Sequence, residues 1–167
     1  MFVVAIFRRT LAYSVGAAFA AFVAAAAAAD PEDPLPRFTS LKADEVNVRT
    51  GPGTRYPIAW VFVREGLPVE VVAEYELWRR IVDVDGAEGW IHRGMLSDRR
   101  SAIVVGGAQT FYRRPDAEAR VVLRAESGVL GRLFDCREGW CEMQIAGLKG
   151  WTRRDHLWGV YPGEEIR

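Results

Sequence analysis

A short glycine-rich loop is the first segment whose residue types and spacing suggest chemistry. Gly51-Pro52-Gly53 lies between Arg49 and Arg55, as in a loop that cradles a phosphate. A dinucleotide-binding loop needs a third glycine where Tyr56 stands and a helix directly after it, and Pro57 blocks such a helix. The G-K-S/T sequence of a P-loop is also missing. We therefore interpret this segment as a turn, in which glycines supply positive φ angles.

Cys136 and Cys141 are the two cysteines of the chain. Their C-x4-C spacing differs from the C-x-x-C spacing of redox-active pairs, which favours a structural disulfide over a redox centre. The four residues between them include a turn-forming glycine, so a hairpin with a four-residue loop would place the cysteines opposite each other. We predict a disulfide that adds roughly 2 kcal/mol in the chain-entropy model.

The other residues with catalytic potential lack a supporting pattern. His92 and His156 stand at non-equivalent places and show neither H-x3-H nor H-E-x-x-H spacing, so no metal site is predicted. Asp83 and Asp85 flank a predicted turn, where acids are usually turn formers with solvated charges. A hydrolase that uses two such carboxylates stays an alternative, but no feature favours it. The sequence predicts no catalytic residue, no cofactor and no metal.

An internal repeat organises the chain after residue 40. Glu76–Leu96 and Glu138–Leu157 align when one residue is dropped from the second copy. The coincident positions are Trp78 with Trp140, Gly86 with Gly147, Gly89-Trp90 with Gly150-Trp151, and Leu96 with Leu157. So many shared glycines and tryptophans indicate a tandem repeat of about 60 residues, divided near residues 99–101.

Each copy has the pattern of short strands. Residues 67–73 and 81–84 are rich in β-branched side chains, and Asp85-Gly86 is a strong tight-turn signal. No window of 12 residues after the leader keeps a helical apolar period. The sequence therefore predicts an all-β fold of two small barrels or sandwiches. About 60 residues is close to the lower limit for an independent core, so the copies are expected to pack on each other.

Tryptophans are the better candidates for a binding surface. Trp90 and Trp151 follow glycine beside apolar residues, and we predict them in the core. Trp78 lies three residues before Ile81, so in a regular strand the two point to opposite faces. With Ile81 in the core, Trp78 would lie at the surface beside Arg79, where it could stack on a sugar or peptide. The alternative is that Trp78 closes one end of the barrel.

The first 29 residues have the pattern of a secretory signal. Arg8 and Arg9 precede the uncharged stretch Leu11–Ala29, which ends in small residues. We predict cleavage near Ala29, and a retained membrane anchor is the alternative. Export by the general or the twin-arginine route stays open. Residues 30–40, with three prolines and several acids, are predicted to form a linker.

The net charge and the predicted export limit the functions that the sequence predicts. Removing Arg8 and Arg9 from the 22 basic residues leaves 20 against 22 acidic ones, which gives no general attraction for nucleic acid. The exported product is expected in the periplasm or outside the cell, with no membrane span after cleavage.

The sequence resembles the bacterial SH3 domains over residues 41–165. In the first copy the resemblance rests on V-N-V-R with G-P-G and Y-P between Val46 and Pro57, on Gly66–Val71, on Trp78 and on Gly86–Trp90. In the second copy it rests on Cys136–Cys141, Gly147–Trp151 and Leu157–Glu164, while the start of that copy is degenerate. The resemblance implies two tandem SH3-like β-barrels, at 41–99 and 101–165, that bind ligands and do not catalyse.

Members of that family often bind peptidoglycan or a peptide, so we expect a non-catalytic binding protein of the cell envelope. The alternative is a scaffold whose partner is another envelope protein, with exposed aromatic residues as the contact patch. An enzyme is the third reading, and it lacks a catalytic constellation. The predicted ligand-binding residues are Arg49, Tyr56, Trp60, Trp78 and Arg79.

Overall fold

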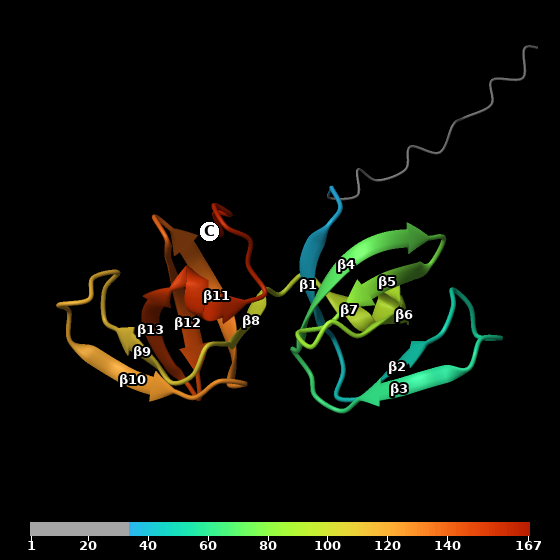
Figure 1. Ribbon diagram of the computed structural model, residues 1–167, viewed down its shortest axis with the longest axis horizontal. Helices are drawn as coiled ribbons and strands as arrows, with labels where there is room; N and C mark the ends of the chain where they lie inside the picture. The colour runs from blue at the N-terminus through green and yellow to red at the C-terminus, as the bar shows by residue number, and fades with distance from the viewer. Residues whose placement is uncertain (1–33) are drawn as a thin grey trace, which may run out of the picture. The chain divides into compact units, whose positions relative to one another are not determined.

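The computed structural model describes residues 34–167 of the chain (Figure 1). The predicted signal peptide, its cleavage site and the first part of the predicted linker lie outside the described residues. The described part is built from strands, with two 3-10 helices of three residues each, which confirms the all-β prediction. No helix of this part is long and apolar enough to cross a membrane.

The first barrel is a seven-stranded sheet with the order β3-β2-β6-β5-β4-β1-β7 (Figure 1). Its strands are β1 (Arg37–Leu41), β2 (Val46–Arg49), β3 (Ile58–Phe62), β4 (Pro68–Tyr75), β5 (Trp78–Val82), β6 (Glu88–His92) and β7 (Leu96–Ser97). The 3-10 helix η1 (Arg93–Met95) connects β6 to β7. All of the pairs are antiparallel.

The second barrel repeats this order as β10-β9-β13-β12-β11-β8-β14. Its strands are β8 (Ser101–Val104), β9 (Gln109–Tyr112), β10 (Val121–Ala125), β11 (Leu130–Arg137), β12 (Trp140–Ile145), β13 (Leu148–Arg153) and β14 (Leu157–Trp158). The helix η2 (Arg154–His156) corresponds to η1. Each strand of the second barrel has a counterpart seven places earlier, so the predicted repeat is a repeat of topology.

The first barrel begins inside the segment that we predicted as a linker. Residues 37–40 belong to β1, which pairs with both β4 and β7. Ser40 is buried, and its hydroxyl donates to the carbonyl of Arg99 at 2.6 Å. The side chains of this segment are therefore built into the barrel, and proline content alone did not reveal this.

The first core comes from strands with period-two burial. In β2, Val46 and Val48 are buried while Asn47 between them is exposed. The core cluster consists of Leu41, Val46, Val48, Val69, Val71, Ile81 and Ile91. The second core cluster also contains both cysteines, which are fully buried beside Phe111 and Met143.

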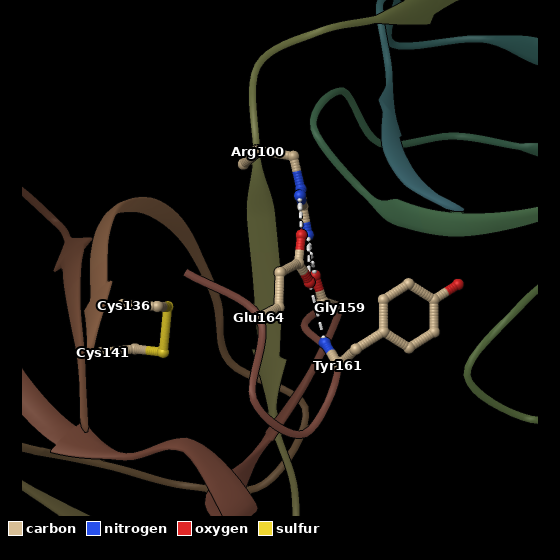
Figure 2. Close-up of a disulfide and its surroundings, with 6 residues drawn as sticks. All are labelled: Arg100, Cys136, Cys141, Gly159, Tyr161 and Glu164. Atoms are coloured by element: carbon tan, nitrogen blue, oxygen red, sulfur yellow. Dashed lines mark hydrogen bonds and ion pairs between the residues drawn. A yellow bond between two sulfur atoms is a disulfide. The ribbon is translucent and has the colours of Figure 1, made fainter. Parts of the chain in front are cut away.

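The predicted disulfide between Cys136 and Cys141 is present in the second barrel (Figure 2). The loop between them is shorter than the expected four residues, because Arg137 and Trp140 also pair across β11 and β12. Glu138 and Gly139 make the turn alone, with φ angles of 49° and 77°. A two-residue turn of this kind needs positive φ at both positions, which glycine supplies at the second.

The repeated Gly-Trp pair has a different role from the one we predicted. A Cβ atom on Gly89 would lie 2.3 Å from Val48 Cγ1, so glycine is what lets β6 cross the core closely. Trp90 alternates with the buried Gly89 and Ile91 and is half-buried on the other face, so its prediction as a core residue was wrong. Trp151 is buried as predicted, but on that same outer side, with the Arg137 guanidinium 5.0 Å from its ring centre.

The two barrels contact each other within one compact unit, Asp33–Arg167, as the small size of each core led us to expect. The Ser101 hydroxyl donates to the carbonyl of Gly66 at 2.6 Å, and the Tyr161 hydroxyl donates to Glu70 Oε1 at 2.7 Å. Phe38 of β1 packs its ring against Trp158 and Tyr161, with centroid distances of 5.0 and 4.6 Å. Burial and the hydrogen bond to Glu70 raise the pKa of the Tyr161 phenol.

The tail that carries Tyr161 is fixed to its own barrel by Arg100 and Glu164. Figure 2 shows the Arg100 guanidinium beside the Glu164 carboxylate and the carbonyl of Gly159. Glu164 Oε2 also accepts from the backbone N–H of Tyr161 at 2.9 Å. Burial acts to raise the pKa of Glu164, but these hydrogen bonds and the Arg100 charge outweigh it and lower that pKa. The tail is thus held in one conformation by an ion pair.

Removing the disulfide tests its contribution to stability. In a Cys136→Ala/Cys141→Ala variant, we expect the free energy of unfolding to fall by about 2 kcal/mol, because the unfolded chain regains loop freedom. Urea denaturation followed by tryptophan fluorescence measures this change, with the wild-type protein under a reducing agent as the comparison. An unchanged urea midpoint would contradict the structural role of the bond.

Candidate functional site

A groove of about 270 Å³ lies on the first barrel beside Trp78. The side chains that line it are Glu45, Asn47, Arg49, Thr54, Trp78, His92 and Met95. Strand pairing explains why they meet: Trp78 at the start of β5 is directly opposite His92 at the end of β6. Arg49 at the end of β2 pairs with Trp90 on the other edge of β6.

Trp78 and His92 form the aromatic part of this groove. Their rings meet edge to face at 5.6 Å, and Trp78 is half-buried, as its alternation with the fully buried Ile81 predicts. His92 Nδ1 accepts a hydrogen bond from the backbone N–H of Gly94 at 3.1 Å. This acceptor role places the proton of the neutral ring on Nε2, where it can be donated to a ligand.

Arg49 holds the glycine-rich loop in place next to the groove. Its Nη1 donates to the carbonyls of Tyr56 and Thr54 at 2.7 and 3.2 Å. The Tyr56 ring lies against Gly51, where a Cβ atom would come within 2.5 Å of the ring. The loop is therefore a turn, as predicted. The prediction that its glycines supply positive φ angles was wrong, because neither Gly51 nor Gly53 has a positive φ, and Gly51 instead leaves room for the Tyr56 ring.

The structure brings only some of the predicted ligand residues together. Arg49 and Trp78 line the groove, and Tyr56 lies in the adjoining loop. Trp60 is half-buried against the first core, with Phe62 at 6.1 Å, and does not line the groove. Arg79 is 3% exposed, and its Nε pairs with Glu74 at 3.0 Å.

Arg79 is buried and forms an ionic cluster with the partly buried Glu74 and Arg37, through which it supports the site indirectly. Its Nη1 donates to the carbonyls of Glu76 and Trp78, and so fixes the turn from which β5 begins. Glu74 pairs with Arg37 at 2.6 Å as well. A β-bulge between Val71 and Ala73 sets the register that places Glu74 opposite Arg79.

Sequence reasoning did not single out His92 as a binding residue. The signal that could have found it is the aligned repeat, in which His92 corresponds to Arg153. In the structure both residues lie opposite the equivalent tryptophans, since Arg153 pairs with Trp140 as His92 pairs with Trp78. The Arg153 guanidinium lies 5.4 Å from the centre of the Trp140 ring, and Tyr112 contacts the same ring at 6.0 Å.

The groove offers the chemistry of recognition. An indole edge, an imidazole donor, a carboxylate and an amide surround it, and such mixed apolar and polar linings orient small ligands. Glu45 and His92 are its two acid–base groups. In the described part of the chain, the one hydrogen bond of the His92 ring joins its Nδ1 to the backbone N–H of Gly94. The described residues also contain no cluster of metal-ligating side chains.

Comparison with known proteins identifies the class of this double barrel. The family model of the bacterial SH3 domain matches the chain twice, at residues 42–98 and 106–159. The chain therefore belongs to the bacterial SH3 domain family, as a tandem of two such domains.

Individual relatives are more distant. A protein of Bacillus subtilis (strain 168) named "Putative N-acetylmuramoyl-L-alanine amidase YrvJ" is 25% identical over 143 residues. That match covers 74% of this chain but only 27% of the relative, so the chain spans about a quarter of the relative's length. The solved structures of NlpC2 and NlpC1 from Trichomonas vaginalis are 12% and 13% identical, each with a TM-score of 0.34. They cover 74% and 75% of this chain, and the matches span 48% and 46% of their own chains.

Arg79 and its neighbour Arg80 give a matched test of the ionic cluster. Arg79→Ala should lower the free energy of unfolding by about 3 kcal/mol, because it removes one of the two guanidinium partners of Glu74 and the donor to the carbonyls of Glu76 and Trp78. Arg80 is exposed and pairs with Glu88 only at 3.7 Å, so Arg80→Ala should change it by less than about 1 kcal/mol. Urea titration of both variants measures the two changes in the free energy of unfolding. Equal losses would contradict the stabilising role of the Arg79 contacts.

Proposed function

We propose that this protein is a non-catalytic binding protein of the bacterial cell envelope, and that its first barrel engages peptidoglycan or its peptide stems. The observation that carries the proposal is the groove at Trp78, His92 and Arg49 on a bacterial SH3 domain. The named amidase of Bacillus subtilis supports it, because that name refers to N-acetylmuramoyl-L-alanine, a unit of peptidoglycan. The predicted export signal agrees with a site of action outside the cytoplasm.

The chemistry of the groove suits such a ligand. The indole of Trp78 offers an apolar surface to a sugar ring or a peptide methyl group, while its edge is fixed by His92. His92 Nε2 can donate to a carbonyl, and Asn47 can donate and accept. Tyr56, Trp60 and Arg79 then act indirectly, by shaping the loop, the core and the turn that hold the lining residues.

A second candidate function is a scaffold for another envelope protein. Strand β3 is an edge of the first sheet, and Ile58 and Val61 on it are 47% and 39% exposed. Val63, directly after the strand, is 79% exposed. Edge strands with exposed apolar side chains are templates for pairing with another chain. This surface lies on β3, whereas the groove is built mainly from β2, β5 and β6, so the two functions can be tested separately.

Sedimentation with purified peptidoglycan sacculi tests the first proposal. We expect the purified protein to sediment with sacculi, and Trp78→Ala to weaken binding by about 2 kcal/mol, roughly thirtyfold, as for a buried aromatic hot spot. Trp140→Ala removes the equivalent residue of the second barrel and is the matched control, which should bind as the wild type does. Circular dichroism confirms that both variants fold.

Two outcomes would contradict this assignment. If the folded wild-type protein stays in the supernatant at low salt, peptidoglycan is not its ligand. If Trp78→Ala and Trp140→Ala bind equally well, the groove of the first barrel is not the binding site. In the first case, a Val61→Asp variant in a search for envelope protein partners would test the β3 surface.

A further inference from the structure

A second cavity lies where the two barrels meet, and none of the residues in the first-barrel groove takes part in it. This inter-barrel cleft has a volume of about 310 Å³. The residues that line it include Leu41 and Gly66 of the first barrel and Leu130 and Gly131 of the second. Since each barrel supplies part of the wall, the cleft exists only in the tandem. Small-molecule sites are often found at such domain boundaries, with volumes from about 300 Å³ upward.

Among the described residues, three charged side chains that line the cleft form no ion pair. Arg99 and Arg132 line it and are exposed. In the part of the chain that the structure describes, neither guanidinium forms an ion pair, and Arg132 lies over the Phe134 ring at 4.7 Å. Glu65 on the same rim is also exposed and without an ion pair among these residues. Arg100, in contrast, is already held by Glu164.

Contacts around the cleft hold its walls in place before any ligand arrives. Ser101 lines the cleft and bonds to the carbonyl of Gly66, which lines it from the other barrel. Ser40 lines it as well and bonds to the carbonyl of Arg99. The Tyr161–Glu70 hydrogen bond and the Phe38 stacking connect the barrels on another part of their contact. A preformed site saves the ordering entropy that binding would otherwise cost.

From these features we propose that the inter-barrel cleft binds a short peptide through its free ends. The peptide carboxylate would pair with Arg99 and Arg132, its amino group would face Glu65, and a small apolar side chain would lie on Leu130, which is only partly buried. Guanidinium groups favour carboxylates because their paired N–H donors match the two oxygens. The residues that line the cleft include no aromatic ring, which disfavours a sugar that would need a stacking surface.

This site goes beyond the proposed function and does not depend on it. The cleft and the groove share no lining residue, so binding of sacculi through Trp78 and binding of a peptide between the barrels can fail independently.

An NMR titration of the ¹⁵N-labelled protein with trialanine tests the proposal. Saturable shifts are expected at the amides of Gly66, Ser101 and Gly131. Trialanine amide, which lacks the carboxylate, should bind at least about tenfold more weakly, as should an Arg99→Gln/Arg132→Gln variant that has lost both charged partners. These arginines are exposed, and the same spectra show whether the variant keeps the fold.

The matched control is an Arg113→Gln/Arg114→Gln variant. It removes the same charge from an exposed segment of the second barrel that does not line the cleft, and it should keep the wild-type affinity. The proposal is overturned if trialanine and its amide bind equally. It is also overturned if both double variants weaken binding equally, or if no shifts arise at the three cleft amides up to tens of millimolar peptide.

Discussion

The contact between the C-terminal tail of the second barrel and the first barrel is the constraint on which the rest of this structure depends. Tyr161 donates a hydrogen bond to Glu70 of the first barrel, and its ring lies against Phe38, the second residue of β1. The tail can do this because Arg100 and Glu164 hold it in place. A barrel of about 60 residues has a marginal core, and mutual packing adds buried apolar surface to both. The cleft proposed as a peptide site owes its geometry to this arrangement, because both barrels line it.

Within each barrel, the same strand positions carry different chemistry. Trp78 and Trp140 occupy equivalent places, but His92 faces the first and Arg153 lies over the second. In the first barrel Arg49 fixes a loop and borders an open groove, whereas Tyr112 at the equivalent place packs against Trp140. The disulfide, which the first barrel lacks, supports the core of the second. The tandem thus combines a barrel with the groove that we propose as a binding site and a barrel whose core contains a disulfide and whose tail contacts the first barrel.

Much of the fold could be predicted from the sequence, because the paired glycines and tryptophans of the two copies are direct consequences of barrel geometry. Gly89 and Gly150 recur since a Cβ atom there would collide with Val48 or Phe111. The burial of Arg79 was also within reach: the alternation that places Trp78 outward places Arg79 on the same face as Ile81. The pairing of Arg79 with Glu74 could not be predicted, because a β-bulge in β4 sets the register that places Glu74 opposite Arg79. The cleft between the barrels arises from packing of residues far apart in sequence, for which no local pattern exists.

The measurement that tests the central claim most directly is ¹⁵N relaxation of the backbone amides, analysed separately for residues 42–98 and 106–159. If the tail contact unites the barrels, both sets fit one rotational diffusion tensor with the correlation time of the whole compact unit. In a Phe38→Ala/Tyr161→Phe variant, the two sets of amides should give different rotational correlation times. If the wild-type barrels already tumble with different, shorter correlation times, they move independently, and the tail contact does not unite them in solution.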